Sequence, residues 1–374
     1  MRKITLFLVL LIAYQAIAQD NQDNIEVVNI ENQAVQDYMT ETENLYRSNS
    51  DYRVSVITKY NTNPKYGKNL HWPQGKKVKW NATTPASSIK EIRITASENE
   101  DYSDAYTFNP DSKAVNSYEI RNLLPNRTYY YKVEEFLNDG TVNEKAHGVF
   151  RTEGQVRMIQ FRNNANVRDI GGWNTQYGCP VKYGRLYRSG SLERKTANGR
   201  HDFVDNLKVV AELDLRHETK RNSSCLGSDI DYLRIPHTAG IKGIRDNQGD
   251  YLKDLKWIIA RLKEDKNVDW HCAIGCDRCG TVSFLIEGLL GLDEVDLCRD
   301  YELSTFSLGK TNKRVRGHLK GMISYIRTFG SDDDNLARCF YKYWLKIGMS
   351  KEELDYFLDT MLDKDAANNQ KINK

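Results

Sequence analysis

The chain has 374 residues, of which 40% are hydrophobic and 10% aromatic, and a formal net charge of +3. This length is too great for one ordinary domain, and the hydrophobic content suits packed cores rather than disorder. Because the charge is nearly balanced, the sequence does not indicate a protein that binds nucleic acid or a membrane surface through a broad electric field.

Residues 1–18 have the pattern of a secretory signal peptide. Arg2 and Lys3 supply the positive start, residues 4–13 form a short apolar run, and a small-residue cleavage site ends at Ala18. The apolar run is too short to span a bilayer, and no other long apolar stretch follows. We therefore predict an exported protein, periplasmic or secreted, that has no membrane span.

Residues 19–51 form a polar segment in which Val35, Tyr38 and Met39 predict one short amphipathic helix. From residue 52 to 153 short β-rich runs recur between clusters of turn residues, which is typical of a β-sandwich. The expected strands are 78–80, 91–96, 118–120, 129–133 and 149–152.

The segment 123–133, Leu-Leu-Pro-Asn-Arg-Thr-Tyr-Tyr-Tyr-Lys-Val, resembles the entry to strand F of fibronectin type III domains. It is especially similar to the related N-terminal domains that accompany some purple acid phosphatases. The resemblance implies that Tyr129 is a tyrosine-corner residue, and it implies a fold rather than an activity.

Residues 155–366 change to an α/β pattern, and a polar tail, 367–374, follows. Strands are expected at 209–215, 232–236 and 268–271, and helices at 255–262, 280–292 and 350–362. The loop between the strand at 268–271 and the helix that begins near Gly280 reads His-Cys-Ala-Ile-Gly-Cys-Asp-Arg.

A loop between a strand and a helix directs successive backbone N–H groups into one concavity, which binds tetrahedral dianions. Cys272, at the start of the loop, sits in the same positive field, which lowers the pKa of a thiol and makes it a nucleophile. Arg278 follows six residues later and can grip two phosphate oxygens, while Gly275 lets the backbone turn tightly.

The same residues admit two other hypotheses. The spacing of Cys272, Cys276 and Cys279 matches the ligands of the iron–sulfur cluster of radical enzymes that use adenosylmethionine. Such clusters need a reducing compartment, which the signal peptide argues against. A zinc site from these cysteines and His271 would place four ligands within nine residues, which is too crowded to enclose a tetrahedral ion easily. We expect no metal and no cofactor.

Motifs around the loop make its interpretation specific. The segments 166–173 (Asn-Val-Arg-Asp-Ile-Gly-Gly-Trp), 184–192, 213–216 (Leu-Asp-Leu-Arg) and 300–304 (Asp-Tyr-Glu-Leu-Ser) resemble the bacterial tyrosine phosphatase family whose loop reads His-Cys-x-x-Gly-Lys-Asp-Arg-Thr-Gly. The resemblance spans about 160–362. It implies an α/β domain with a central, mostly parallel sheet flanked by helices, and phosphomonoester hydrolysis through a cysteinyl-phosphate without metal.

The resemblance also implies roles. Cys272 would be the nucleophile, Arg278 the clamp on the transition state, and Asp277 the general acid or, alternatively, a salt-bridge partner that holds the loop. Asp246 and Asp250 are the alternative acids. The phosphate-binding residues would be Ala273, Ile274, Gly275, Cys276, Asp277 and Arg278. His271 would support the thiolate, and Arg168, Asp169 and Arg216 would brace the loop.

Two residues depart from the family's loop. Cys276 stands where the family has Lys, so a positive charge facing the phosphate is missing, and Cys279 replaces a Thr whose hydroxyl would stabilise the departing thiolate. Turnover is therefore expected to be slow. Alternatively, Cys276 or Cys279 forms a reversible disulfide with Cys272.

We therefore predict a cysteine-dependent phosphatase that acts on phosphorylated proteins or on small phosphomonoesters, with phosphoinositides and inositol phosphates among the candidates. The alternative is a catalytically weak module that binds phosphorylated ligands without turning them over. The missing Lys weakens the case for a multiply phosphorylated substrate. The sequence does not choose the substrate.

Overall fold

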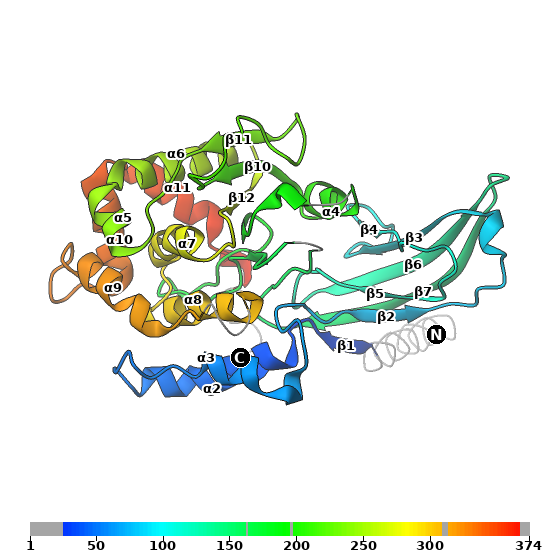
Figure 1. Ribbon diagram of the computed structural model, residues 1–374, viewed down its shortest axis with the longest axis horizontal. Helices are drawn as coiled ribbons and strands as arrows, with labels where there is room; N and C mark the ends of the chain where they lie inside the picture. Colours follow the sequence, from blue (N-terminus) through cyan, green and yellow to red (C-terminus); the bar gives the residue numbers. More distant parts are fainter. Residues whose placement is uncertain (1–24, 162–163, 195–196, 309–312, 367–374) are drawn as a thin grey trace, which may run out of the picture. The chain divides into compact units, whose positions relative to one another are not determined.

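The structure of the protein, a computed structural model, describes residues 25–161, 164–194, 197–308 and 313–366 (Figure 1). The predicted signal peptide and the polar tail 367–374 lie outside these ranges. The described chain divides into unit 1, residues 25–30 and 75–154, and unit 2, residues 31–74 and 155–366. Among the described residues, no helix combines the length and the apolar character needed to cross a membrane.

Unit 1 consists of two β-sheets. The larger has the strand order β1-β7-β6-β3-β4, and the smaller pairs β2 with β5. Every pair is antiparallel except β1 with β7. The strands are β1 (Glu26–Asn29), β2 (Lys76–Lys79), β3 (Ile89–Ser97), β4 (Tyr106–Phe108), β5 (Ser117–Ile120), β6 (Thr128–Leu137) and β7 (Val142–Glu153).

One hydrophobic core serves both sheets of unit 1, because Val78 and Ile120 of the smaller sheet join Ile94 and Val133 of the larger one. Tyr129 is fully buried in this core, and its hydroxyl accepts a hydrogen bond from the backbone N–H of Leu124 at 3.1 Å. That contact with the chain five residues upstream is the one expected of a tyrosine-corner residue.

The structure divides the chain differently from the predicted boundary at residue 52. Residues 52–74 belong to unit 2, because Ile57, Tyr60 and Leu70 are buried in its core, and β1 from the polar segment belongs to unit 1. The predicted amphipathic helix is confirmed as α2 (Gln33–Arg47), whose buried face includes Val35, Tyr38 and Met39.

The sheet of unit 2 has the order β11-β10-β12-β9-β8, and all neighbouring pairs are parallel except β8 with β9. The expected mostly parallel sheet is therefore present. Its strands are β8 (Arg168–Asp169), β9 (Leu186–Ser189), β10 (Val209–Asp214), β11 (Asp231–Arg234) and β12 (Asn267–His271). β12 is the central strand, so its carboxyl end lies among the ends of its neighbours.

Helices cover both faces of this sheet. Leu186 and Tyr187 are successive residues of β9, so they point to opposite faces, and they belong to different hydrophobic clusters. α6 and α7 contribute to the cluster of Leu186, and Phe203 lies in the cluster of Tyr187. Figure 1 shows α2 and α3 beside α8, which they contact. The helices of unit 2 besides α2 are α3 (Ile57–Thr62), α4 (Ala197–His201), α5 (Gly240–Asp246), α6 (Gln248–Lys263), α7 (Asp277–Leu289), α8 (Glu294–Leu308), α9 (Lys320–Arg327), α10 (Leu336–Ile347) and α11 (Lys351–Met361).

Local sequence explains the helices that the pattern predicted. In α6, Leu255, Ile258, Ile259 and Leu262 are buried along one stripe, as their spacing requires. α11 begins after Ser350, whose side chain accepts from the N–H of Glu353 while the Glu353 carboxylate accepts from the N–H of Ser350. α7 is buried on nearly all sides, which agrees with its apolar composition and with its contacts with β12 and β9.

Candidate active site

The loop that follows β12 joins the centre of the sheet to the N-terminus of α7. β12 ends at His271, residues 272–276 form the loop, and α7 begins at Asp277. Gly275 adopts a φ of +69°, and a Cβ added there would lie 2.7 Å from the backbone carbon of Ser189. Both the left-handed conformation and the close approach of β9 therefore require glycine.

Cys272 is 2% exposed at the start of this loop. A hydrogen bond from the Cys279 thiol, with others from the backbone N–H groups of Cys279 and Ile274 and the charge of Arg278, holds the pKa of Cys272 well below its usual value despite burial. The site therefore favours a thiolate, which is the nucleophilic form of cysteine.

Arg278 lies in the first turn of α7, and its guanidinium is engaged by a carboxylate that the sequence analysis did not identify. Its two terminal nitrogens donate to the two carboxylate oxygens of Glu218 at 2.8 and 2.9 Å. These hydrogen bonds lower the pKa of Glu218 to about 2. Glu218 comes two residues after Arg216, just beyond the Leu-Asp-Leu-Arg motif, and that position was the signal available in the sequence.

Asp277 is the first residue of α7, and its side chain is 53% exposed. Its carboxylate accepts from the Arg314 guanidinium at 2.6 Å. Of the two roles expected for Asp277, the structure shows the salt bridge, and its exposed carboxylate stands on the first residue of the helix that follows the loop.

The alternative acids are placed elsewhere. Asp246 pairs with its neighbour Arg245, and Asp250 pairs with Lys253 one turn further along α6. Among the described residues, neither carboxylate makes a hydrogen bond or ion pair with the loop 271–278.

The two departing cysteines have different surroundings, although both are fully buried. Cys279 lies against Cys272, and its thiol points toward the carbonyls of Ser189 at 3.5 Å and Trp270 at 3.7 Å. Burial and the neighbouring Cys272 thiolate raise the pKa of Cys279 well above its usual value, so it remains a thiol. Burial also raises the pKa of Cys276, whose largest charged influence is Arg314.

A buried network holds the back of the loop. The carbonyl of Gly275 accepts from Asn166 at 2.7 Å and from Arg188 at 2.9 Å. Arg188 and Arg168 both pair with the Asp300 carboxylate of α8, at 3.1 and 2.9 Å. Arg168 thus braces the loop through other residues.

Asp300 keeps its charge inside this network. Burial alone would raise the pKa of Asp300, but the charges of Arg168 and Arg188 hold it below its usual value. Burial, followed by the Asp300 charge, raises the pKa of the neighbouring Glu287 well above its usual value. The network therefore contains two guanidinium groups and two carboxyl groups whose pKa values are shifted in opposite directions, and all four side chains are buried.

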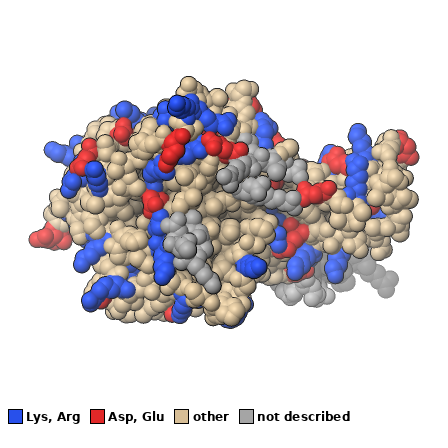
Figure 2. Space-filling view, in the orientation of Figure 1, with Lys and Arg blue, Asp and Glu red and all other residues tan. Residues whose placement is uncertain are grey.

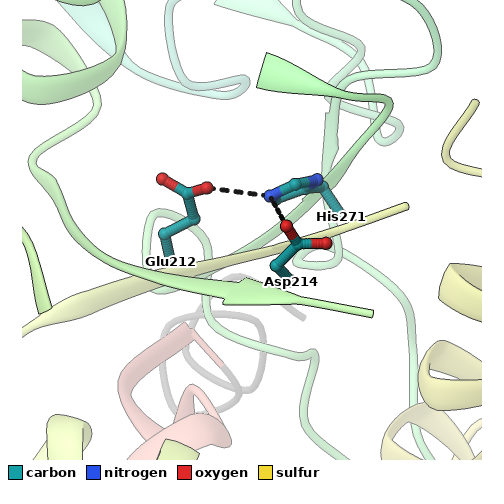
Figure 3. Close-up of side chains that lie close together, drawn as sticks. All are labelled: Glu212, Asp214 and His271. Atoms are coloured by element: carbon teal, nitrogen blue, oxygen red, sulfur yellow. Dashed lines mark hydrogen bonds and ion pairs between the residues drawn. The ribbon is translucent and has the colours of Figure 1, made fainter. Parts of the chain in front are cut away.

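His271 joins a second buried polar cluster at the end of β12. Its Nε2 lies 2.9 Å from Glu212 Oε1 and 4.0 Å from Asp214 Oδ2 (Figure 3). Burial works against the charged imidazolium, but the hydrogen bond and charge of Glu212 raise the pKa of His271 above its usual value. The ligand atoms of Glu212, Asp214 and His271 are close enough together to hold a metal ion. Among the described residues, the loop cysteines belong to no such group.

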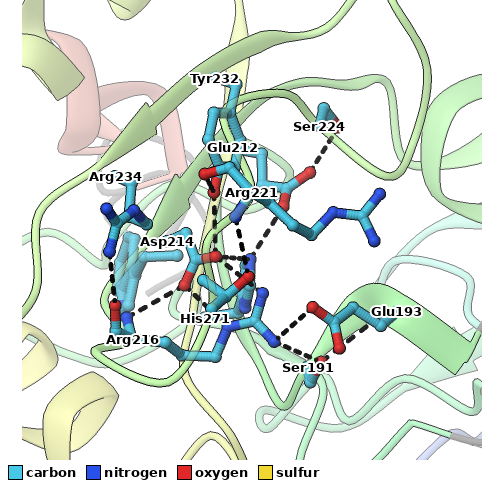
Figure 4. A network of polar contacts seen from close by, with 12 residues as sticks. Ser191, Glu193, Glu212, Asp214, Arg216, Arg221, Ser224, Tyr232, Arg234 and His271 are labelled. Atoms are coloured by element: carbon cyan, nitrogen blue, oxygen red, sulfur yellow. Dashed lines mark hydrogen bonds and ion pairs between the residues drawn. The ribbon is translucent and has the colours of Figure 1, made fainter.

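Protein donors already occupy those carboxylates. Asp214 accepts two hydrogen bonds from the guanidinium of Arg216 and one from the hydroxyl of Tyr232, and Ser224 donates to Glu212. We therefore interpret the cluster as a salt-bridge network rather than a metal centre. Figure 4 shows Arg216 between Asp214 and the segment of Ser191 and Glu193.

Arg216 reaches the loop through that segment, because the N–H of Ser191 donates to the carbonyl of Ala273 at 3.2 Å. Arg216 therefore braces the loop indirectly, as expected. Asp169 does not: its carboxylate binds Arg157 and the N–H groups of Gly171 and Gly184, so it orders the chain before β9 instead.

On the face shown in Figure 2, Lys and Arg side chains are interspersed with Asp and Glu, so the described residues of that face carry no broad field of one sign.

The amino-acid sequence that contains this loop was compared with known protein families and with curated proteins. The model of the tyrosine phosphatase family matches residues 159–363, which is more than half of the chain. Comparison with curated proteins gave no match.

Similar solved structures include TpbA of P. aeruginosa, at 18% identity over 48% of this chain and 90% of that one, with a TM-score of 0.27. The catalytic core of the PP-IP phosphatase SIW14 of S. cerevisiae matches at 18% identity, 44% and 93% coverage and a TM-score of 0.30. Tk-PTP matches at 16% identity, 51% and 97% coverage and a TM-score of 0.22. On the family match over residues 159–363, the chain belongs to the tyrosine phosphatase family.

Proposed function

We propose that this protein hydrolyses phosphomonoesters through a cysteinyl-phosphate, with Cys272 as nucleophile and Arg278 as the clamp on the transferred phosphoryl group. The observation that carries the proposal is the thiolate environment of Cys272, which combines a thiol donor, backbone donors and the guanidinium of Arg278 at the N-terminus of α7. The backbone N–H groups of residues 273–278 would bind the phosphoryl oxygens.

The reaction has two steps. In the first, Cys272 Sγ bonds to phosphorus, the bond from phosphorus to the ester oxygen breaks, and Asp277 gives the leaving oxygen a proton. In the second, water attacks phosphorus, Asp277 takes a proton from that water, and phosphate leaves as the Cys272 thiolate is restored. The Cys279 thiol would then donate to that thiolate, although more weakly than a hydroxyl.

Hydrolysis of an aryl phosphate by the full chain tests the proposal. We expect Cys272→Ser to lower the steady-state rate by at least about a thousandfold, because an alcohol is a poor nucleophile here. Cys225→Ser, a change to a cysteine outside the loop, is the matched control and should keep its activity. Equal rates for the wild type and Cys272→Ser would disprove the proposal.

A module that binds phosphate but turns over poorly is the second candidate. The observations that favour it are the thiols at positions 276 and 279 and the engagement of Arg278 by Glu218. It predicts one burst of leaving group per protein molecule and no steady state. Continued turnover after the burst would exclude it.

We also propose that Cys279, rather than Cys276, protects the nucleophile under oxidation, because Cys279 contacts Cys272. Hydrogen peroxide would convert the Cys272 thiolate to a sulfenic acid and release hydroxide. The Cys279 thiol would then form a disulfide with it and release water.

Mass mapping after peroxide treatment tests this pairing. We expect a bond between Cys272 and Cys279 and recovery of activity with a thiol reductant. Cys279→Ser should lose the recovery, whereas Cys276→Ser should keep it. A Cys272 that stays unpaired in the oxidised wild type would refute the proposal.

Three further parts of the proposal concern location and partners. We infer that unit 1 is a fibronectin type III-like domain and that it positions substrates. Its two sheets and the hydrogen bond of Tyr129 support the inference about its fold.

We propose export to the periplasm or outside the cell, which fractionation of the producing cells would test. The substrates would be phosphorylated proteins or small phosphomonoesters, and a panel of phosphotyrosine peptides, phosphoinositides and inositol phosphates would distinguish them.

A further inference from the structure

Cys276 stands in the loop at a position where the tyrosine phosphatase family has Lys, so the loop lacks that positive charge. Its thiol is fully buried, and burial raises its pKa, so the group is neutral. A site that receives a dianion in a buried loop gains from each nearby positive charge. Another residue of the chain, placed near Cys276, would supply the positive charge that the loop lacks.

Arg314 lies where such a charge is needed. It follows α8 in the sequence, 38 positions after Cys276 and far from the loop motif, yet its guanidinium contacts Asp277 at 2.6 Å. It is also the strongest charged neighbour of the Cys276 thiol, ahead of Arg188. The side chain is only 10% exposed, so its charge acts in a partly desolvated setting.

The backbone of Arg314 is firmly placed. Its N–H donates to the Thr305 hydroxyl at 2.9 Å, and that hydroxyl donates to the Arg314 carbonyl at 3.1 Å. Thr305 is buried in α8, and its own carbonyl accepts from Asn61 at 2.6 Å. A change of partner by the guanidinium therefore requires movement of the side chain alone.

We propose that Arg314 is the second phosphate-binding cation of this site and that its guanidinium exchanges the Asp277 carboxylate for a phosphoryl oxygen when a phosphomonoester binds. The proposal rests on the proposed function of the loop. A phosphomonoester dianion attracts a guanidinium more strongly than one carboxylate does, and its oxygens suit the planar fork.

The exchange would have a consequence for the acid step. In the ion pair Asp277 is a carboxylate that accepts hydrogen bonds, whereas protonating the leaving oxygen requires a carboxyl group that carries a proton. Moving Arg314 onto the phosphoryl group would release the Asp277 side chain from its ion pair, so that it can face the leaving oxygen.

The experiment uses the full chain and two readouts, the dissociation constant of inorganic phosphate and the KM and kcat for an aryl phosphate. We expect Arg314→Gln to weaken phosphate binding and raise KM by about tenfold or more, the usual effect of losing a charge-assisted hydrogen bond. Arg314→Lys, which keeps the charge and is the safer variant for folding, should lose less. Arg338→Gln on α10 controls for net charge and should change neither value.

A compensating substitution separates a charge effect from a structural one. Cys276→Lys restores the family's residue, and in the Arg314→Gln background it should recover most of the phosphate affinity. Unchanged phosphate binding in folded Arg314→Gln, with only kcat reduced, would show that Arg314 merely holds Asp277 and would overturn the proposal. Failure of Cys276→Lys to rescue would do the same.

These outcomes are distinct from failure of the proposed function. If Cys272 is not the nucleophile, Cys272→Ser keeps its turnover whatever Arg314 does. If the Arg314 assignment alone is wrong, Cys272→Ser is inactive and Arg314→Gln binds phosphate as the wild type does.

Discussion

The five-stranded sheets of the two units differ in how many charged side chains they bury. In unit 1, Glu91 and Arg93 of β3 form an ion pair with 32% and 39% of their side chains exposed. In unit 2, Arg188 of β9, Glu212 of β10 and Asp269 of β12 are at most 1% exposed. Arg188 lies in contact with the loop before α7, because its guanidinium donates to the carbonyl of Gly275.

Burial of a charge costs free energy unless a partner compensates it, so ordinary sheets keep charges at the surface. Unit 1 follows that rule except at Glu135 of β6, which is fully buried beside Thr84 and Lys145, and its exposed ion pairs do little for its stability. Unit 2 departs from the rule at several places, one of which is the loop before α7. The buried charges at the end of β12 indicate a fixed electrostatic environment rather than an arrangement for maximal stability, which is typical of functional sites.

The largest effect is expected at Asp300, whose carboxylate compensates two buried guanidinium groups. Asp300→Ala should lower the free energy of unfolding by about 3–5 kcal/mol, because it leaves Arg168 and Arg188 buried without a counter-charge. Urea denaturation measures this, with Asp300→Asn as an intermediate case. A loss below about 1 kcal/mol would mean that the network is not held by charge.

A smaller effect, dependent on pH, is expected at Asp269, where burial raises the pKa to about 7. A carboxyl group with a raised folded-state pKa stabilises the fold below its unfolded pKa and loses that contribution as pH rises toward 7. Asp269→Asn, which can still accept from Ser189, should remove this loss and be more stable than wild type by about 1–3 kcal/mol at pH 8.

The unfolding free energies of both proteins, measured from pH 4 to 8, check the sign. The advantage of Asp269→Asn should grow with pH across that window. A constant difference, or one that shrinks, would show that Asp269 does not titrate there.

The smallest effect is expected in unit 1. Glu91→Gln removes a partly exposed ion pair, so the free energy of unfolding should change by no more than about 0.5 kcal/mol. The same denaturation experiment measures it, and 1 M salt should erase the difference. A loss of 2 kcal/mol would contradict the difference proposed between the two five-stranded sheets.

The sequence predicted the parts of the site that are contiguous in the chain. The strand before Cys272, the tight turn at Gly275 and the helix after it follow from residues within a few positions of one another. The parallel sheet and α6 were predicted for the same reason, since hydrophobic spacing is a local property. The roles of Cys272, Arg278 and Asp277 remain predictions.

Residues that reach the site from elsewhere were not predicted. Glu218 and Arg314 contact Arg278 and Asp277 through tertiary folding. Glu218 had only its place beside the Leu-Asp-Leu-Arg motif as a signal, and no local pattern distinguishes Arg314 from an ordinary surface charge. β1 was missed because its four residues bury little, so they show no alternation, and it pairs with β7 more than 120 positions later. The boundary at residue 52 failed because α3 is too short to show a helical period.

The path of the chain through the two units has a practical consequence for dissecting the protein. Residues 75–154 are an insertion within unit 2, whose first segment supplies Tyr38, Tyr46 and Ser55 as hydrogen-bond donors to the buried carboxylate of Glu302. A fragment cut to the limits of the family match would strip all three donors from that carboxylate. A gene fusion that transplants the catalytic unit must therefore carry two separate coding segments, one from each side of the insertion.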